Sequence, residues 1–363
     1  MVDKVGPRKL MVAGWAVIGL GFLLMSRINS LASFYGTFLV IASGMSFGSG
    51  VVMNAAIVNW FTKKRSRAMA ISFIGPGVCG LLAPLLAGLI VWIGWRDTLT
   101  VMGITLLVAG VPLSLLFRHK PEQYGYLPDG EIVSPNPGQP STAQARGERS
   151  PAVSGSGFTV KEALSTRAFW LLSFAFFFQQ MGTSAVTVHI VAYLESVEIP
   201  TSIAALMVTG MTLCSLIGRI GFGFIGDFIN KKYLIALAFL LQTIGLFLFS
   251  LITADRMWLL ILFLLTFGPG FGAPIPLRPA LQADYFGTKN FGTIMGLMIV
   301  VSTVGGLVSP VLAGYIFDVT TSYHLAWQIF TVITLPSIPL ILLAGQPKNL
   351  NVPSFQADSK PTN

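Results

Sequence analysis

The sequence predicts an all-α membrane protein that crosses the bilayer many times, and three observations support this prediction. Apolar residues make up 53% of the 363 residues and charged residues only 10%, whereas an average soluble domain carries about 25% charged residues. The apolar residues form long runs, and the charged residues lie in short strips between these runs. So few charges do not cover a soluble surface, and most of the chain is therefore expected to face lipid.

Ten of the apolar runs have the length of a membrane helix, which needs about 20 mostly apolar residues. These spans are 10–26, 33–60, 68–93, 98–117, 168–194, 203–226, 233–253, 257–277, 290–317 and 324–345. Bundled helices tolerate the Gly and Pro inside them, because neighbouring helices satisfy the freed backbone groups. The first run follows Lys4, Arg8 and Lys9 as a signal peptide would, but nine more spans and the lack of a small-residue cleavage site favour a helix.

The basic residues predict the orientation of the spans. Nineteen Lys and Arg lie in the strips before the odd-numbered spans and in the C-terminal tail, whereas three lie on the opposite side. This bias places both termini in the cytoplasm of a cell-membrane protein. The net charge of +9 is therefore a feature of membrane topology, and nucleic acid is excluded as a partner because no basic face is formed. Cys79 and Cys214 both lie inside apolar runs, which excludes a disulfide framework.

One long loop, 118–167, divides a half with four spans (1–117) from a half with six spans (168–345), and 346–363 forms a cytoplasmic tail. The middle of the loop is rich in Pro, Ser and Gly and predicts a flexible linker. Near its end, Thr159 and Glu162 have the spacing of a capping box. We expect a short helix there at the inner membrane surface, with an extended lead-in to the fifth span as the alternative.

The two halves repeat each other. Pro84-Leu85-Leu86-Ala87-Gly88 matches Pro310-Val311-Leu312-Ala313-Gly314 at an offset of 226, and Asp3 with Arg8 and Lys9 corresponds to Asp227 with Lys231 and Lys232. Parallel repeats of this kind build many transporters. Two spans precede Asp227, but none precedes Asp3. The repeat therefore predicts a parent of twelve helices whose first two are absent here, and an incomplete carrier that does not transport is one alternative function.

Signature residues at the inner ends of the spans resemble those of the major facilitator superfamily. The first copy comprises Asp3, Gly6, Arg8 and Lys9, and the second comprises Gly223, Asp227, Lys231 and Lys232, with Asn230 breaking the pattern. Gly94-Trp95-Arg96 resembles the outer turn of this family. The resemblance implies a secondary transporter that works by alternating access. In it, Asp227 would form charge-assisted bonds across the interface of the halves near Lys231 and Lys232, which must break when the cytoplasmic side opens.

Three further stretches resemble the monocarboxylate and oxalate:formate carriers within this superfamily. They are Trp60-Phe61 before a basic strip, Pro121-Glu122-Gln123-Tyr124-Gly125 with Pro128-Asp129-Gly130, and Ser215-Leu216-Ile217-Gly218-Arg219. This resemblance implies a small organic anion as substrate, with Arg219 binding its carboxylate. Lactate carriers have an Asp where Ser215 stands here, and the oxalate antiporter has a Lys in the helix that corresponds to 290–317, which has neither Lys nor Arg. The missing Lys leaves a single positive charge, which favours a monocarboxylate over a dicarboxylate. The missing Asp gives no support to proton coupling through an acid beside Arg219.

Arg219 is the single ionisable residue that lies well inside a predicted span. The residues themselves therefore also single it out, because charge inside the bilayer is costly and marks functional sites. No acid lies in the middle of a span, and a guanidinium can bind a carboxylate through two parallel hydrogen bonds. Arg219 lies eight residues, roughly 12 Å, before Asp227. The alternative is therefore a structural residue that extends to the inner interface or pairs with Asp227.

Other polar groups inside the spans are weaker candidates for the binding cavity. They are Gln179, Gln180, Thr183, His189, Asn54 and Asn59. Polar residues in membrane helices equally often bond to a neighbouring helix. Histidine side chains can take up protons near neutral pH, so His189 is a candidate proton site, although its expected outer position equally favours an interfacial role. For Arg278, Gln282 and Asp284, where the eighth span meets the cytoplasm, we expect gating or structural roles.

Sequence patterns for enzyme chemistry are absent. There is no Gly-Lys dipeptide for a phosphate-binding loop, the three His residues are scattered, and no paired Asp cluster could hold magnesium. The sequence therefore predicts neither an enzyme nor a cofactor. A lone anion that enters the cell needs a co-transported proton or an exchanged anion. The missing second positive charge favours proton symport slightly over exchange.

Overall fold

The structure is a computed structural model that describes residues 6–48, 50–118, 121, 126, 128–130 and 157–347, without the side chains of 76–84 and 130. The first half contains α2 (Pro7–Met25), α3 (Leu31–Gly48), α4 (Val51–Trp60), α5 (Arg65–Ser72), α6 (Ile74–Thr105), η1 (Leu106–Gly110) and α7 (Val111–Leu115). The second half contains α8 (Val160–Ser165), α9 (Arg167–Ser196), α10 (Thr201–Ile225), α11 (Lys231–Phe249), α12 (Leu259–Gly272), α13 (Pro274–Phe286), α14 (Phe291–Thr320), α15 (His324–Thr334) and α16 (Ser337–Leu343). The all-α prediction is confirmed.

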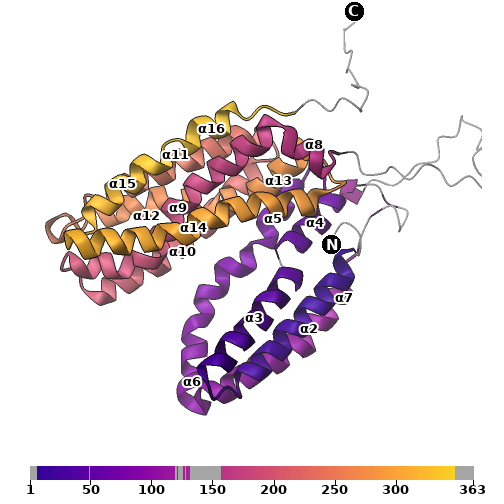
Figure 1. The fold of residues 1–363 in the computed structure, drawn as a ribbon, viewed down its shortest axis with the longest axis horizontal. Coiled ribbons are helices and arrows are strands. Elements are labelled where there is room, and N and C mark those ends of the chain that lie inside the picture. Colours follow the sequence, from indigo (N-terminus) through magenta and orange to yellow (C-terminus); the bar gives the residue numbers. More distant parts are fainter. Residues whose placement is uncertain are drawn as a thin grey trace, which may run out of the picture.

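In the part of the chain that the structure describes, nine helices are long and apolar enough to cross a membrane. The sequence predicts ten because it separates 68–93 from 98–117, and the structure joins them in α6. Gly94 breaks the helical conformation of α6 with a φ of 81°, which glycine adopts without strain. The chain reverses there, as Figure 1 shows at the tip labelled α6. Helix α6 therefore contains most of the span predicted at 68–93 and the beginning of the span predicted at 98–117, which continues through η1 and α7.

Each half is a bundle of its own, and the two bundles meet at one end (Figure 1). In the first half α2 packs against α3 and α6, and in the second α9 packs against α14 and α12 against both α10 and α11. Small residues permit this close packing. A Cβ on Gly14 of α2, for example, would lie 2.2 Å from the backbone N of Gly48 at the end of α3.

The halves meet through α4, α5 and α6 of the first half and α10, α13 and α14 of the second. An apolar cluster crosses this junction and includes Met11 and Val52 from the first half and Ala283 and Met295 from the second. Away from the junction the bundles diverge, and in Figure 1 the bend of α6 and the helix α15 lie apart, each at the end of its own bundle remote from the junction. The conformation is therefore closed at the end that carries α4, α5 and α13.

The two ends of the predicted linker are each attached to a turn between helices. Asp129, in the short helix η3 (Pro128–Gly130), accepts hydrogen bonds from the backbone just before α5. Gly157 pairs with Gly287, and Phe158 packs on Phe286 in the turn between α13 and α14. Most of the predicted flexible stretch, like Asp3 and the tail beyond 347, lies outside the described residues.

The capping box at the end of the linker is confirmed. Thr159 N donates to Glu162 Oε2 at 2.8 Å, and Glu162 N donates to Thr159 Oγ1 at 3.3 Å. These two bonds satisfy free donors at the start of α8, which runs from Val160 to Ser165. A helix is therefore present, and its position at the membrane surface stays a prediction.

Candidate functional site

Three residues of α10 and one just after its C-terminal end lie along one face of this helix. Ser215, Arg219, Gly223 and Asp227 are spaced by four, which places them one above another along a helix. This face packs against α5 of the first half. The junction between α5 and α10 therefore holds the predicted binding arginine and the predicted signature residues in one continuous row.

Arg219 is buried, with 7% of its surface exposed, and its guanidinium bonds only to neutral groups. Nη1 donates to the backbone oxygen of Phe73 in the first half at 3.1 Å, and Nη2 donates to Ser215 Oγ at 3.3 Å. Nε has no hydrogen-bond partner. Among the described residues no carboxylate lies within ion-pair distance of Arg219, so the alternative pairing with Asp227 does not occur.

Gly223 is the point of closest approach between α10 and α5. A Cβ added to Gly223 would lie 2.3 Å from the Cβ of Ala70 and 3.3 Å from the backbone oxygen of Ser66. No real Cβ fits at that distance, so any other residue would push the two helices apart. The signature glycine therefore sets the separation at which Arg219 and Asp227 reach across the junction.

Asp227 bonds to the first turn of α5. Its Oδ1 accepts a hydrogen bond from Ser66 N at 2.9 Å, and its Oδ2 lies 3.2 Å from Nε of Arg67. The Asp227 side chain is only 5% exposed. The bond across the halves that the sequence predicts for Asp227 is thus present, but it is made with Arg67 and not near Lys231 or Lys232.

A second ion pair crosses the halves beside the first. Asp284, at the end of α13, binds Arg65 Nη1 at 2.6 Å and Lys231 Nζ at 2.7 Å. Lys232 instead donates to the backbone oxygen of Leu342. Since Arg65 and Arg67 lie in the same turn of α5, this one turn carries both inter-half pairs. From the sequence, Arg65 and Arg67 served only to predict the orientation of the spans, and their ion pairs were not predicted. The signal that could have indicated these pairs is their position in a basic strip directly after a span.

The first copy of the signature lies elsewhere. Gly6 precedes α2 with a φ of 86°, a conformation that favours glycine. Arg8 and Lys9 follow it and are exposed. Neither residue has an ion pair among the described residues. The structure therefore does not bring the described part of this copy to the junction with the second half.

The comparisons with known proteins decide the family. The model of the Major Facilitator Superfamily matches residues 1–275 and 172–362. The chain belongs to this superfamily. Monocarboxylate transporter 13 of Bos taurus is 26% identical over 99% of this chain and 76% of its own length, and monocarboxylate transporter 12 of Mus musculus is 27% identical over 96% and 74%. The oxalate:formate antiporter of Oxalobacter formigenes is 25% identical over 84% and 69%.

Solved structures of the superfamily share the fold. The human organic anion transporter MFSD10 has a TM-score of 0.69 at 15% identity and covers 94% of this chain and 78% of its own. The E. coli fucose:proton symporter has a TM-score of 0.67 at 13% identity, with coverages of 95% and 86%. The protein is thus a multi-pass membrane transporter of the Major Facilitator Superfamily and is related to carriers of small organic anions, not to enzymes.

Within this transporter, the polar candidates of α9 bond to neighbouring helices. Gln179, Thr183 and Gln242 of α11 form a buried cluster in which Gln179 Nε2 donates to Gln242 Oε1. Gln242 Nε2 in turn donates to Thr183 Oγ1 at 2.7 Å. Gln180 lies on the other side of α9, beside Gly306 of α14. All of these contacts lie within the second half, as expected for groups that hold helices together.

His189 joins three segments near the C-terminal end of α9. Its Nε2 lies 3.0 Å from the backbone oxygen of Pro310, and its Nδ1 lies 3.2 Å from the Tyr323 hydroxyl. Because a carbonyl oxygen only accepts, Nε2 carries the proton, and in the neutral ring Nδ1 accepts from Tyr323. These contacts fit a structural role between α9, α14 and α15.

Asn54 is the one polar candidate besides Arg219 that the structure places at the junction. It is 2% exposed, and its Nδ2 contacts the Met295 sulfur of α14 at 3.9 Å. Its Oδ1 has no partner. Asn59, near the end of α4, makes interactions of its own. An amide oxygen without a partner between the halves is costly in this closed state.

The structure corrects one expectation, that Arg219 is alone inside a span. The span predicted as 257–277 extends through α13 to Phe286, which places Arg278 eight residues inside its end. The Arg278 guanidinium stacks on Phe176 of α9 and donates to Ser302 Oγ of α14 at 3.1 Å. Both contacts belong to the second half. Arg219 therefore remains the arginine within a span that reaches the first half.

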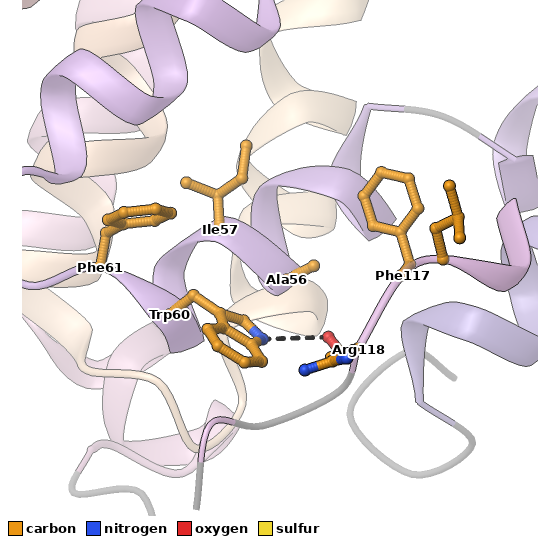
Figure 2. A pocket seen from close by; sticks show the side chains of 7 residues that line it. Ala56, Ile57, Trp60, Phe61, Phe117 and Arg118 are labelled. Atoms are coloured by element: carbon orange, nitrogen blue, oxygen red, sulfur yellow. Dashed lines mark hydrogen bonds between the residues drawn. The ribbon is translucent and has the colours of Figure 1, made fainter. Parts of the chain in front are cut away.

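A pocket lies in the first half, between the ends of α4 and α7. Its lining residues are Ala56, Ile57, Trp60, Phe61, Leu116, Phe117 and Arg118. Figure 2 shows the Trp60 indole, which donates to the Arg118 backbone oxygen at 3.1 Å. The lining is mainly apolar and none of its residues contacts Arg219, so this pocket does not fit a carboxylate site.

Proposed function

We propose that this transporter carries a small organic anion, most simply a monocarboxylate, and that Arg219 binds its carboxylate. The observation that supports this proposal is the buried guanidinium at the junction, which has only neutral partners and an Nε without any. A charge inside a bilayer without a counter-ion is costly. A carboxylate accepts two parallel hydrogen bonds from a guanidinium and would replace the weak bonds to Phe73 and Ser215.

Alternating access would come from the same junction. The pairs Arg67–Asp227 and Arg65–Asp284 hold one end of the two halves together. Opening of that end requires both pairs to break, so they bias the equilibrium between the two states. We assign this end to the cytoplasm, together with the linker at 118–167 and the tail at 346–363. The two membrane-spanning halves are the four-span half at 1–117 and the six-span half at 168–345. Arg8, Lys9 and Lys232 would lie on that side.

Coupling is needed because a lone anion that enters a cell works against the inside-negative potential, about 2.3 kcal/mol per charge at 100 mV. We favour a co-transported proton, since 290–317 offers neither Lys nor Arg as a second site for a dicarboxylate. Exchange is the second candidate, and the similarity to the oxalate:formate antiporter supports it.

The test uses the protein reconstituted in sealed vesicles without internal anion. An inward proton gradient is expected to drive accumulation of labelled lactate or a similar acid. Accumulation only after preloading with a counter-anion would replace symport by exchange. Arg219→Lys is expected to impair uptake at least tenfold, because an ammonium does not reproduce the planar fork of the guanidinium. Arg256→Lys, an exposed arginine in the turn before α12, is the matched control. Unchanged uptake in Arg219→Lys would reject the binding role.

A further inference from the structure

The turn between α4 and α5 receives a carboxylate from far along the chain. Asp129 Oδ2 accepts hydrogen bonds from Lys63 N at 2.8 Å and Thr62 N at 3.1 Å. Asp129 Oδ1 accepts a third bond from Lys64 N at 3.3 Å. Three consecutive backbone N–H groups therefore converge on the side chain of one residue of the linker.

These bonds supply what the start of α5 lacks. Lys64 occupies the N-cap position, and no side chain of the turn itself caps the helix. A lysine has no acceptor, whereas an aspartate is among the preferred caps and its charge suits the positive end of a helix. Asp129 has a φ of 63°, a backbone conformation that Asp and Asn tolerate better than most residues. The loop is thus shaped to present this carboxylate.

Electrostatics favours the same arrangement. Partial burial raises the pKa of Asp129, but the backbone bonds from Lys63, Lys64 and Thr62, together with the charge of Lys63, outweigh it and hold the pKa below its usual value. The carboxylate is therefore charged at neutral pH. It adds a negative charge to a strip of four cations in five residues, of which Arg65 and Arg67 face Asp284 and Asp227.

We propose that Asp129 is a positioning residue for the inter-half ion pairs, because it fixes the first turn of α5 from which Arg65 and Arg67 reach the second half. Helix α5 has only eight residues, and Arg65, Ser66 and Arg67 in its first turn make three of the polar contacts across the junction. A helix this short depends strongly on its cap. Loss of the cap therefore shifts the equilibrium away from the state that is closed at this end. The inference rests on alternating access and not on the identity of the substrate.

Position 66 can report whether the junction between the halves is closed or open, because Ser66 is fully buried there in the closed state. Ser66→Cys is nearly isosteric and keeps the backbone N–H that bonds to Asp227. With Cys79→Ser and Cys214→Ser in the same full-length chain, the rate of labelling by a water-soluble maleimide measures how often the junction opens. Asp129→Asn is the main variant, since Asn keeps the tolerated backbone conformation and removes the charge. Asp129→Glu keeps the charge on a longer side chain.

The matched control is Glu162→Gln. Glu162 is the other carboxylate of the linker that takes part in capping a short helix, but its helix is α8, which carries none of the inter-half ion pairs. Asp129→Asn is expected to raise the labelling rate roughly threefold, because it removes the negative charge at the positive end of α5 and one of the two oxygens that accept the backbone bonds. Asp129→Glu is expected to give a smaller increase. Glu162→Gln should leave the rate unchanged. A second control is a chain that keeps the native Cys214 and Ser66 and carries Cys79→Ser. Cys214 packs beside Gly268 within the second half, so the rate of its labelling measures a general loosening of that half. Equal labelling of parent and Asp129→Asn, or an equal rise in Glu162→Gln or at Cys214, would overturn the proposal.

Discussion

Arg67 Nε lies 3.2 Å from Asp227 Oδ2, so the first turn of α5 and the end of α10 are paired across the junction of the two halves. The Arg67 guanidinium also stacks on Phe228, the residue after this aspartate. Asp227 is almost fully buried and additionally accepts the Ser66 N–H. Truncation of Arg67 leaves the buried Asp227 charge without its ion pair, which costs more than the pair itself contributes. In the proposed alternating-access cycle, this contact would break and re-form at every turnover.

The pair predicts the outcome of a charge exchange. Arg67→Asp and Asp227→Arg alone each bring like charges together, and we expect each to reduce uptake by more than tenfold. The double variant restores opposite charges and should recover part of the uptake, which is measured in the same vesicles. The recovery is expected to be partial because an arginine at 227 cannot accept the Ser66 N–H. Additive losses in the double variant would show that the two residues do not act as a pair.

Gly223 predicts a steric effect on the same junction. Gly223→Ala places a Cβ 2.3 Å from the Ala70 Cβ, so the helices must separate. We expect a loss of about 1–3 kcal/mol in stability, as for an overpacked core, and a lower uptake rate. Gly221→Ala is the control, because a Cβ at Gly221 meets nothing within 4 Å. Thermal unfolding in detergent separates the two variants, and equal melting temperatures would contradict the expectation.

His189 gives a prediction about proton coupling. Its two ring nitrogens bond to Pro310 and Tyr323 inside the second half. If these bonds only hold α9 to α14 and α15, His189→Gln should lower the stability by about 1 kcal/mol, the usual size of a hydrogen bond. Uptake by this variant should still depend on the proton gradient. Loss of that dependence, with uptake retained, would instead identify His189 as the proton site.

The buried cluster of Gln179, Thr183 and Gln242 predicts a stability effect without a change in substrate affinity. Gln242→Leu removes one acceptor of Gln179 Nε2 and leaves it only the bond to Thr183 Oγ1 at 3.2 Å. The loss of this buried bond costs roughly 1–3 kcal/mol. Gln180→Leu, on α9, is the control, since Gln180 packs beside Gly306 outside this cluster. Denaturation in detergent and the KM for uptake are the two measurements. A raised KM with unchanged stability would place the cluster in the binding site.

Several local features could be predicted from the sequence because they depend on neighbouring residues. Thr159 and Glu162 form their capping box within four residues, and Gly94 produces the turn that its sequence motif indicates. Arg219 could be selected because its charge lies inside an apolar run. The depth of Arg278 was missed, since Pro274, Pro276 and Pro279 suggest the end of a span, whereas the chain continues as α13 to Phe286.

The sequence by itself determined the membrane class and the helices, because a bilayer leaves the backbone no partner except its own chain and demands long apolar runs. It also determined which residues carry charge at the ends of the spans. Only the tertiary structure decided the partners: Arg67 for Asp227, Arg65 with Lys231 for Asp284, and Asp129 for the start of α5. These partners are 53 to 219 residues apart. The packing of α5 on α10, with Gly223 against Ala70, sets which charges come within reach, and no local pattern records that distance.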